Sequence, residues 1–271
     1  MTVDDWLAAF AAELRRRRVD PAALVAEAAT HLRDSGRAPL QVFGPPAAYA
    51  VTLVDSLRGA TAELRRAPSG EPRLEATKII KRYGRSTVLH GVDLRVHAGE
   101  TVAIIGANGS GKSTLLRICA GLISPDSGHV RIRGTLGYCP QDGGTADFLT
   151  ADEHFVLVGA GRGSSRTEAR AQGRTAAAAL DWPRPGTSGV ARQLSGGTRQ
   201  KLNLVLAGLG DPDVLLLDEP YQGFDNGSYL DFWQQVWRWR DAGKAVVVVT
   251  HRLGELDRAD AVLDLTPGSP R

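Results

Sequence analysis

The sequence predicts an α/β fold in which a buried, mainly parallel sheet is covered by helices. Three short apolar runs carry this prediction, at residues 101–105, 214–217 and 246–249. Uninterrupted apolar runs of this length are typical of parallel strands that are buried on both faces. Helical patterns follow the first two runs, which is the alternation that a parallel sheet requires. With 271 residues, of which 42% are hydrophobic, the chain is long enough for one full domain and a smaller one.

The chain divides into two predicted domains joined by a short linker. Residues 1–66 are predicted to form a small all-α domain of three helices. Residues 67–72 read APSGEP, and proline and glycine in such a stretch favour a linker. Residues 73–271 contain the three apolar runs and are predicted to form the larger α/β domain.

Residues 106–114 read GANGSGKST and fit the phosphate-binding pattern G-x-x-x-x-G-K-[ST]. They stand between an apolar run and a helical pattern, which is the strand, loop and helix context that the motif requires. Glycines let backbone N–H groups approach phosphate oxygens without a Cβ in the way, and a helix N-terminus favours negative charge. Lys112 can reach the β- and γ-phosphates, and Ser113 can ligate Mg²⁺. The residues expected to hold the phosphates are Gly106, Ala107, Asn108, Gly109, Ser110, Gly111, Lys112, Ser113 and Thr114.

Two carboxylates, Asp218 and Glu219, follow the apolar run 214–217. Open α/β sheets bind their ligands at the carboxyl ends of the strands. Asp218 can hold Mg²⁺ there, directly or through a water. Because side chains alternate along a strand, Glu219 can point elsewhere, toward a water in line with the γ-phosphate. Two adjacent acids with separate roles suit nucleotide hydrolysis.

Residues 194–200 read LSGGTRQ and resemble the signature motif of ATP-binding cassette (ABC) ATPases. A helical pattern follows this motif, so its small residues precede a second helix N-terminus that suits an anion. The other motifs of the family occur in the family's order, from about Leu74 to the C-terminus. The matching positions are Tyr83 for the adenine-stacking aromatic, Gln141 for the Q-loop glutamine, Asp218 and Glu219 for Walker B, Asp225 for the D-loop, and His251 for the switch histidine.

The resemblance implies a P-loop NTPase fold with an ABC cassette, whose helical subdomain lies at about residues 142–200. It implies ATP and Mg²⁺ as the cofactors. It also implies a homodimer, because in this family the signature motif of one subunit completes the ATP site of the other. The implied catalytic residues are Glu219, His251, Lys112 and Gln141. The implied metal-binding residues are Ser113, Gln141 and Asp218. The further nucleotide contacts implied are Tyr83, Ser195, Gly196, Gly197 and Asp225.

Two departures from the family pattern bear on function. Thr198 stands where the signature motif usually has glutamine, and residues 221–224 read YQGF in a region that usually reads TSGL. The residues implied to contact the nucleotide, Ser195, Gly197 and Asp225, are kept, so we expect catalysis to be intact. These variant motifs are similar to those of ATPase subunits of bacterial ABC-2-type exporters. The resemblance therefore implies an exporter whose permease is a separate chain.

Composition bears on location and partners. No apolar run approaches the length of a membrane span, and the acidic start lacks the apolar stretch of a signal peptide. We expect a cytoplasmic protein, peripheral on the cytoplasmic face of the membrane and in contact with it through the permease. A net charge of +3 does not by itself indicate nucleic acid. Two alternatives stay open: a soluble ABC ATPase acting on nucleic acid or ribosomes, and an ATP-sensing regulatory module.

The N-terminal helices have their own sequence signals. Thr2 and Asp5 suit a capping box at the start of the first helix, and Pro21 suits the first turn of the second. The segments 31–34 (HLRD) and 43–50 (FGPPAAYA) resemble short helical domains of the HAAS type, which implies a docking or regulatory role. A generic helical docking module is the alternative. The third helix is expected to present one apolar face, made of Tyr49, Leu53 and Leu57.

Overall fold

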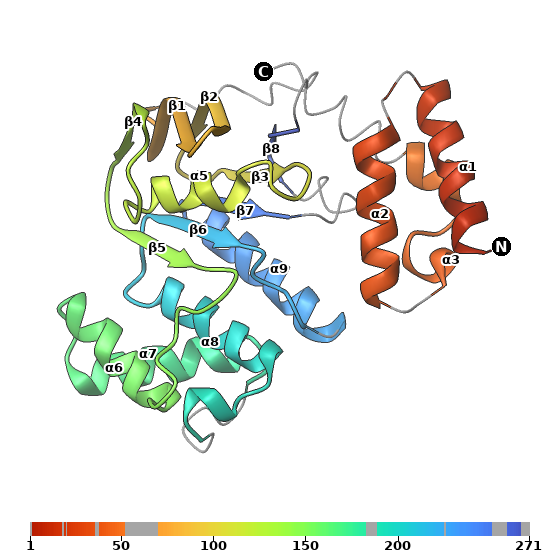
Figure 1. The fold of residues 1–271 in the computed structure, drawn as a ribbon. Helices are drawn as coiled ribbons and strands as arrows, with labels where there is room; N and C mark the ends of the chain where they lie inside the picture. Colours follow the sequence, from red (N-terminus) through yellow and green to blue (C-terminus); the bar gives the residue numbers. More distant parts are fainter. Residues whose placement is uncertain are drawn as a thin grey trace. The chain divides into compact units, whose positions relative to one another are not determined.

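A computed structural model gives the fold of the chain (Figure 1). It describes residues 2–17, 19, 21–35, 38–51, 70–182, 189–224, 226–250 and 259–266. The chain forms two compact units. The first comprises Met1–Ala67, Ala103–Ser110 and Thr250–Arg271, and the second comprises Pro68–Val102 and Gly111–Val249.

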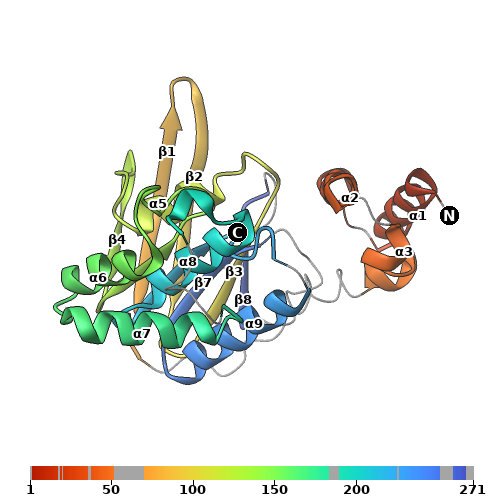
Figure 2. The ribbon, with the colours of Figure 1, turned by 90° about the horizontal axis from the view of Figure 1, so that it is seen from below.

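An antiparallel three-stranded sheet lies in the second unit. Its strand order is β2-β1-β4, with β1 at Leu74–Tyr83, β2 at Ser86–Val96 and β4 at Ser127–Ile132. Figure 2 shows β1 and β2 as a long hairpin. The pairing of β1 with both neighbours shifts register near Lys78, whose φ is +51°. A side chain on Gly128 would meet the backbone of this irregular stretch, so only glycine fits there.

The five-stranded sheet has the strand order β5-β6-β7-β3-β8. Its parallel part pairs Leu217 of β6 with Cys139 of β5, and Asp218 of β6 with Val249 of β7. Every residue of β3, β6 and β7 is buried, as the uninterrupted apolar runs predict. The strands are β3 at Thr101–Ile105, β5 at Leu136–Cys139, β6 at Val214–Asp218, β7 at Ala245–Val249 and β8 at Ala261–Asp264.

Helices cover the parallel part of this sheet. They include α8 at Gly196–Gly208 and α9 at Asn226–Asp241. One hydrophobic cluster joins both helices to the strands, and its buried members include Leu202, Val205, Trp233, Val236, Val246 and Val248. The tryptophan-containing face of α9 therefore serves the core, as its helical spacing predicts.

Two further helices, α6 at Ala151–Gly161 and α7 at Arg166–Ala178, pack side by side (Figure 1). Each begins with a capping box, formed by Thr150 with Glu153 and by Ser165 with Glu168. Gly173 of α7 lies so close to Phe155 of α6 that a side chain there would run into the aromatic ring. These helices fall within the range 142–200 that the resemblance implies for the helical subdomain; the domain boundaries themselves stay a prediction.

The N-terminal helices include α1 at Val3–Arg16, α2 at Pro21–Ser35 and the short α3 at Pro39–Val42, and residues 46–51 are also helical. The predicted capping box is confirmed, because Thr2 and Asp5 exchange backbone-to-side-chain hydrogen bonds of 3.1 Å each. The rings of Trp6, Phe10, Phe43 and Tyr49 form an aromatic cluster, and the Trp6 indole N–H donates to the Gly44 carbonyl at 2.8 Å. Leu53 and Leu57 of the predicted third helix and the linker up to residue 69 lie outside the described residues.

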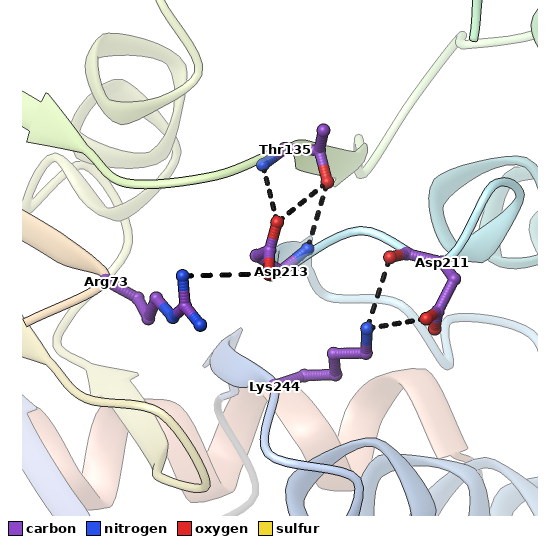
Figure 3. A network of polar contacts seen from close by, with 5 residues as sticks. All are labelled: Arg73, Thr135, Asp211, Asp213 and Lys244. Atoms are coloured by element: carbon purple, nitrogen blue, oxygen red, sulfur yellow. Dashed lines mark hydrogen bonds and ion pairs between the residues drawn. The ribbon is translucent and has the colours of Figure 1, made fainter. Parts of the chain in front are cut away.

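A polar network joins the loops that lead into the parallel strands (Figure 3). Asp213, just before β6, accepts hydrogen bonds from the backbone N–H and the hydroxyl of Thr135 at 2.9 and 3.1 Å. Arg73 lies 3.7 Å from the same carboxylate, and Lys244 pairs with Asp211 at 2.8 Å. The hydrogen bond from the Thr135 backbone lowers the pKa of Asp213 most. The network fixes one end of the sheet, and the candidate site lies at the other.

Candidate nucleotide-binding site

The loop after β3 has the backbone conformation that a phosphate cradle needs. Gly106, Gly109 and Gly111 have φ values of +145°, +81° and +97°, which side chains rarely allow. An added Cβ on Gly106 would lie 2.6 Å from the Ser110 hydroxyl oxygen. The Ser110 backbone N–H donates to the Ala107 carbonyl at 3.0 Å and tightens the loop. The sequence-predicted loop residues from 106 to 110 thus belong to one compact turn.

Helix α5, at Lys112–Cys119, begins directly after this loop with Gly111 as its N-cap. A Cβ on Gly111 would lie 2.7 Å from the Leu89 side chain, so glycine is required on two grounds, space and backbone conformation. Lys112, Ser113 and Thr114 form the first turn of α5, where backbone N–H groups have no partner within the helix. Lys112 is only 7% exposed. A buried ammonium group at a helix N-terminus favours an anionic ligand.

Ser113 and Asp218 meet across this site. The Ser113 hydroxyl donates to one Asp218 carboxylate oxygen at 3.1 Å. The other oxygen, Oδ2, is buried and has no hydrogen-bond partner among the described residues. Burial, with a smaller contribution from the neighbouring Glu219, raises the pKa of Asp218 to about 6, although the Ser113 hydrogen bond opposes the shift.

This pair fits a magnesium ion. A buried carboxylate oxygen without a donor, next to a serine hydroxyl, offers the hard oxygen ligands that Mg²⁺ prefers. Among the described residues, no group of three or more His, Cys, Asp or Glu side chains could hold a metal by itself. Mg²⁺ usually binds through one or two protein ligands together with substrate phosphates, and Ser113 and Asp218 suit that arrangement.

Glu219 follows β6 with a φ of +45°, an uncommon conformation for a residue other than glycine. One Glu219 carboxylate oxygen accepts a hydrogen bond of 3.0 Å from the Gln141 amide N–H group. The structure thus brings together two residues that lie 78 positions apart and that the family resemblance separately implies to be catalytic. Strained backbone of this kind is often kept at functional sites.

The signature motif begins helix α8. Ser195 is the N-cap, since its hydroxyl oxygen accepts from the Thr198 backbone N–H at 3.2 Å. The Thr198 hydroxyl lies 2.8 Å from the same oxygen, so the unusual residue of this motif orients Ser195. A Cβ on Gly197 would lie 2.5 Å from the Gly223 carbonyl oxygen. This close approach requires the second glycine of the motif.

Three predicted site residues remain: Tyr83, Asp225 and His251. Tyr83 ends β1 and is 53% exposed, with the Lys81 ammonium 5.6 Å from its ring centroid. Its ring is therefore accessible to a base. Asp225 and His251 lie outside the described residues. Sequence reasoning missed the buried amides Gln200 and Asn203, which contact the loop that contains Gln141.

Comparison with known proteins identifies the family. The family model "ABC transporter" matches residues 89–222. The chain is 34% identical over 254 residues to the aliphatic sulfonates import ATP-binding protein SsuB of Burkholderia pseudomallei. The aligned residues cover 89% of this chain and 70% of that protein. The chain belongs to the ABC transporter family of ATP-binding proteins.

Other ABC proteins give the same result. The Nod factor export ATP-binding protein I of Paraburkholderia xenovorans is 32% identical over 202 residues, which cover 69% of this chain. The chain spans 66% of that protein, just under two thirds of its length. The solved "Dimeric Structure of MJ0796, a Bacterial ABC Transporter Cassette" superposes with a TM-score of 0.66 at 26% identity, over 72% of this chain and 95% of that one. The P-loop ABC cassette fold and the resemblance to ABC ATPases are both confirmed. The HAAS-type and ABC-2-exporter resemblances stay predictions.

Proposed function

We propose that this chain binds ATP with Mg²⁺ and hydrolyses it as the ATP-binding subunit of an ABC transporter. The observation that carries the proposal is the meeting of three sequence-distant parts in one place. Ser113 at the start of α5 contacts Asp218, and Gln141 contacts the adjacent Glu219. A phosphate cradle, a metal-binding carboxylate and a candidate catalytic carboxylate are the parts that phosphoryl transfer to water needs.

Nucleotide binding is assigned to the loop 106–114. Its backbone N–H groups and Lys112 hold the β- and γ-phosphates, and the exposed Tyr83 ring stacks on adenine. Ser113, Asp218 and Gln141 hold Mg²⁺, which when bound neutralises charge on the phosphate oxygens. The raised pKa of Asp218 implies that its carboxyl would have to give up a proton for the cation to bind below about pH 6.

Hydrolysis is assigned to Glu219. Its carboxylate orients the attacking water and accepts a proton as the water oxygen bonds to the γ-phosphorus and the bond to ADP breaks. His251 is proposed to contact the γ-phosphate. Lys112 stabilises the charge that spreads over the phosphate oxygens in the transition state.

A homodimer is proposed because one chain has one phosphate loop and one signature motif. Ser195, Gly196 and Gly197 stand at the N-terminus of α8, where a second copy of the chain can place its γ-phosphate. Asp225 is proposed to contact nucleotide at the same interface. ATP then joins the two copies, and hydrolysis separates them.

A separate permease is proposed as the membrane partner. Among the described helices, none combines the length and the apolar character needed to cross a bilayer. Relatives include proteins named for export and for import, and the variant signature and D-loop motifs favour an ABC-2-type exporter. In this proposal the protein works at the cytoplasmic face of the membrane. Residues 1–66 form a docking or regulatory domain, joined through the linker 67–72 to the cassette of residues 73–271.

Substitution of Lys112 tests the phosphate site. The Lys112→Ala variant should bind ATP at least about tenfold more weakly or lose hydrolysis, because its buried ammonium group sits at the phosphate loop. The Arg166→Ala variant removes one exposed positive charge from α7 and serves as the matched control. Calorimetric titration with ATP and steady-state hydrolysis are the measurements. Unchanged affinity together with unchanged turnover in Lys112→Ala would overturn the assignment.

A further inference from the structure

Helix α8 carries two buried amide side chains that the proposed chemistry does not use. Gln200 is 5% exposed and Asn203 is 2% exposed, although the other buried residues of α8 are leucine, valine and alanine. The two amides contact each other, since the Asn203 amide N–H group donates to the Gln200 side-chain oxygen at 3.1 Å. Burying amide groups costs free energy unless they are hydrogen-bonded. Their partners therefore indicate why the helix keeps them.

Both amides donate to the loop that follows β5. The Gln200 amide donates to the Pro140 carbonyl at 3.2 Å, and the Asn203 amide donates to the Gly143 carbonyl at 2.9 Å. These two contacts lie on either side of Gln141 in the chain. Figure 1 shows this loop descending from β5 past α8. The amide pair thus fixes the backbone on both sides of the residue that holds Glu219.

A cavity of about 360 Å³ lies beside this loop, lined among others by Pro140, Asp142, Gly144 and Asn203. A side chain on Gly144 would lie 2.6 Å from the Asn203 side-chain oxygen, so the loop passes directly over the amide. That oxygen is buried and has no hydrogen-bond partner within the described ranges. A buried polar group that is left partly unsatisfied costs free energy, so its presence calls for an explanation other than stability.

We infer that Gln200 and Asn203 are positioning residues that set the orientation of Gln141, and through it the orientation of Glu219. The inference rests on the proposed function, in which Glu219 acts on the attacking water. Hydrogen bonds connect the two amides to the loop backbone, and Gln141 in that loop to Glu219. Ser195, the N-cap of the same helix, is proposed to meet the nucleotide of a second copy. These hydrogen bonds would pass any displacement of α8 on to the loop that contains Gln141.

Kinetics of the full-length Gln200→Met and Asn203→Leu variants test the inference. Both replacements keep approximate size and remove the amide donor. We expect kcat to fall at least about tenfold while the Kd for ATP changes less than about twofold, because a small misplacement near the chemistry is costly. Leu202→Ala is the matched control, since it removes buried packing from the same helix but none of these hydrogen bonds. It should lower thermal stability and leave kcat of the folded protein within about twofold.

A double-mutant comparison separates positioning from general damage. In a Gln141→Ala background, Gln200→Met should cause little further loss of kcat, since its effect passes through Gln141. An undiminished further loss there, or kcat within twofold of wild type in the folded single variants, would overturn the inference.

Hydrogen exchange gives a readout that does not depend on hydrolysis. Backbone amides of residues 141–149 should exchange faster in Gln200→Met and Asn203→Leu than in wild type or Leu202→Ala. Unchanged exchange would overturn the inference even if the wild type lacked ATPase activity. Faster exchange with an inactive wild type would support the contact and refute only the proposed hydrolysis.

Discussion

Replacing Asp218 with asparagine should stabilise the protein in the absence of metal and nucleotide. Burial raises the pKa of Asp218 from 3.8 to about 6 in the folded chain. The fold therefore prefers the neutral carboxyl, and its stability falls as the pH rises from about 4 to about 6. At 1.36 kcal/mol per pKa unit, the cost above pH 6 is about 3 kcal/mol. Asparagine has no such cost and can still accept the hydrogen bond from Ser113.

Asp213 provides an opposite control at the start of the same strand. The pKa of Asp213 is lowered, chiefly by the hydrogen bond from the Thr135 backbone. Its carboxylate therefore stabilises the fold above about pH 4, and this contribution is lost as the pH falls through the lowered pKa of the folded state. Asp213→Asn should thus destabilise the protein at neutral pH by about 1 kcal/mol, since this partly exposed site is screened by solvent.

Thermal unfolding at pH 7.5 and at pH 4, in buffer with EDTA, tests both expectations. Tm should rise in Asp218→Asn and fall in Asp213→Asn at pH 7.5, by about 2–4 °C per kcal/mol for a chain of this size. At pH 4 the Asp218→Asn difference should nearly vanish. Mg²⁺ and ATP should raise the Tm of wild type more than that of Asp218→Asn. A lower Tm for Asp218→Asn at pH 7.5 would refute the reasoning.

Two further predictions concern packing and domain organisation. Gly173→Ala should cost about 1–3 kcal/mol of stability, because the new methyl group meets the Phe155 ring. Gly161→Ala is the control, since its methyl group faces open space and should be nearly neutral. Equal urea denaturation midpoints for the two variants would contradict this packing. A chain that lacks residues 1–70 should still fold and bind ATP, while its association with the permease or its regulation changes. Calorimetry measures the ATP affinity, and co-purification measures the association. A folded truncation that no longer binds ATP would show that the helices belong to the cassette.

The fold and the phosphate loop were predictable because their signals are local. Uninterrupted apolar runs predicted β3, β6 and β7, and the glycine pattern of residues 106–114 predicted the loop that precedes α5. Thr2 and Asp5 gave the start of α1 in the same way. In each case the residues that decide the structure are neighbours in the sequence.

The contacts that refine the site could not be predicted because they join distant segments. The Gln141–Glu219 hydrogen bond spans 78 positions, and the contact between Gln200 and Pro140 spans 60. Neither residue type nor spacing specifies such a pair before the chain is folded. The role of Thr198 lies between these two cases. Its hydroxyl hydrogen-bonds the Ser195 hydroxyl only three residues away, but the sequence shows Thr198 only as a residue that differs from the family's usual glutamine.

The most direct test of the central claim is ATP hydrolysis by the Glu219→Gln variant. Turnover should fall by about 10²- to 10⁴-fold, the usual contribution of a general base, while ATP affinity is kept and an ATP-bound dimer accumulates on size exclusion. Glu71→Gln changes an acid whose side chain is 77% exposed, and it should behave as wild type. Near-normal hydrolysis by purified Glu219→Gln, with no ATP-dependent dimer, would contradict the account.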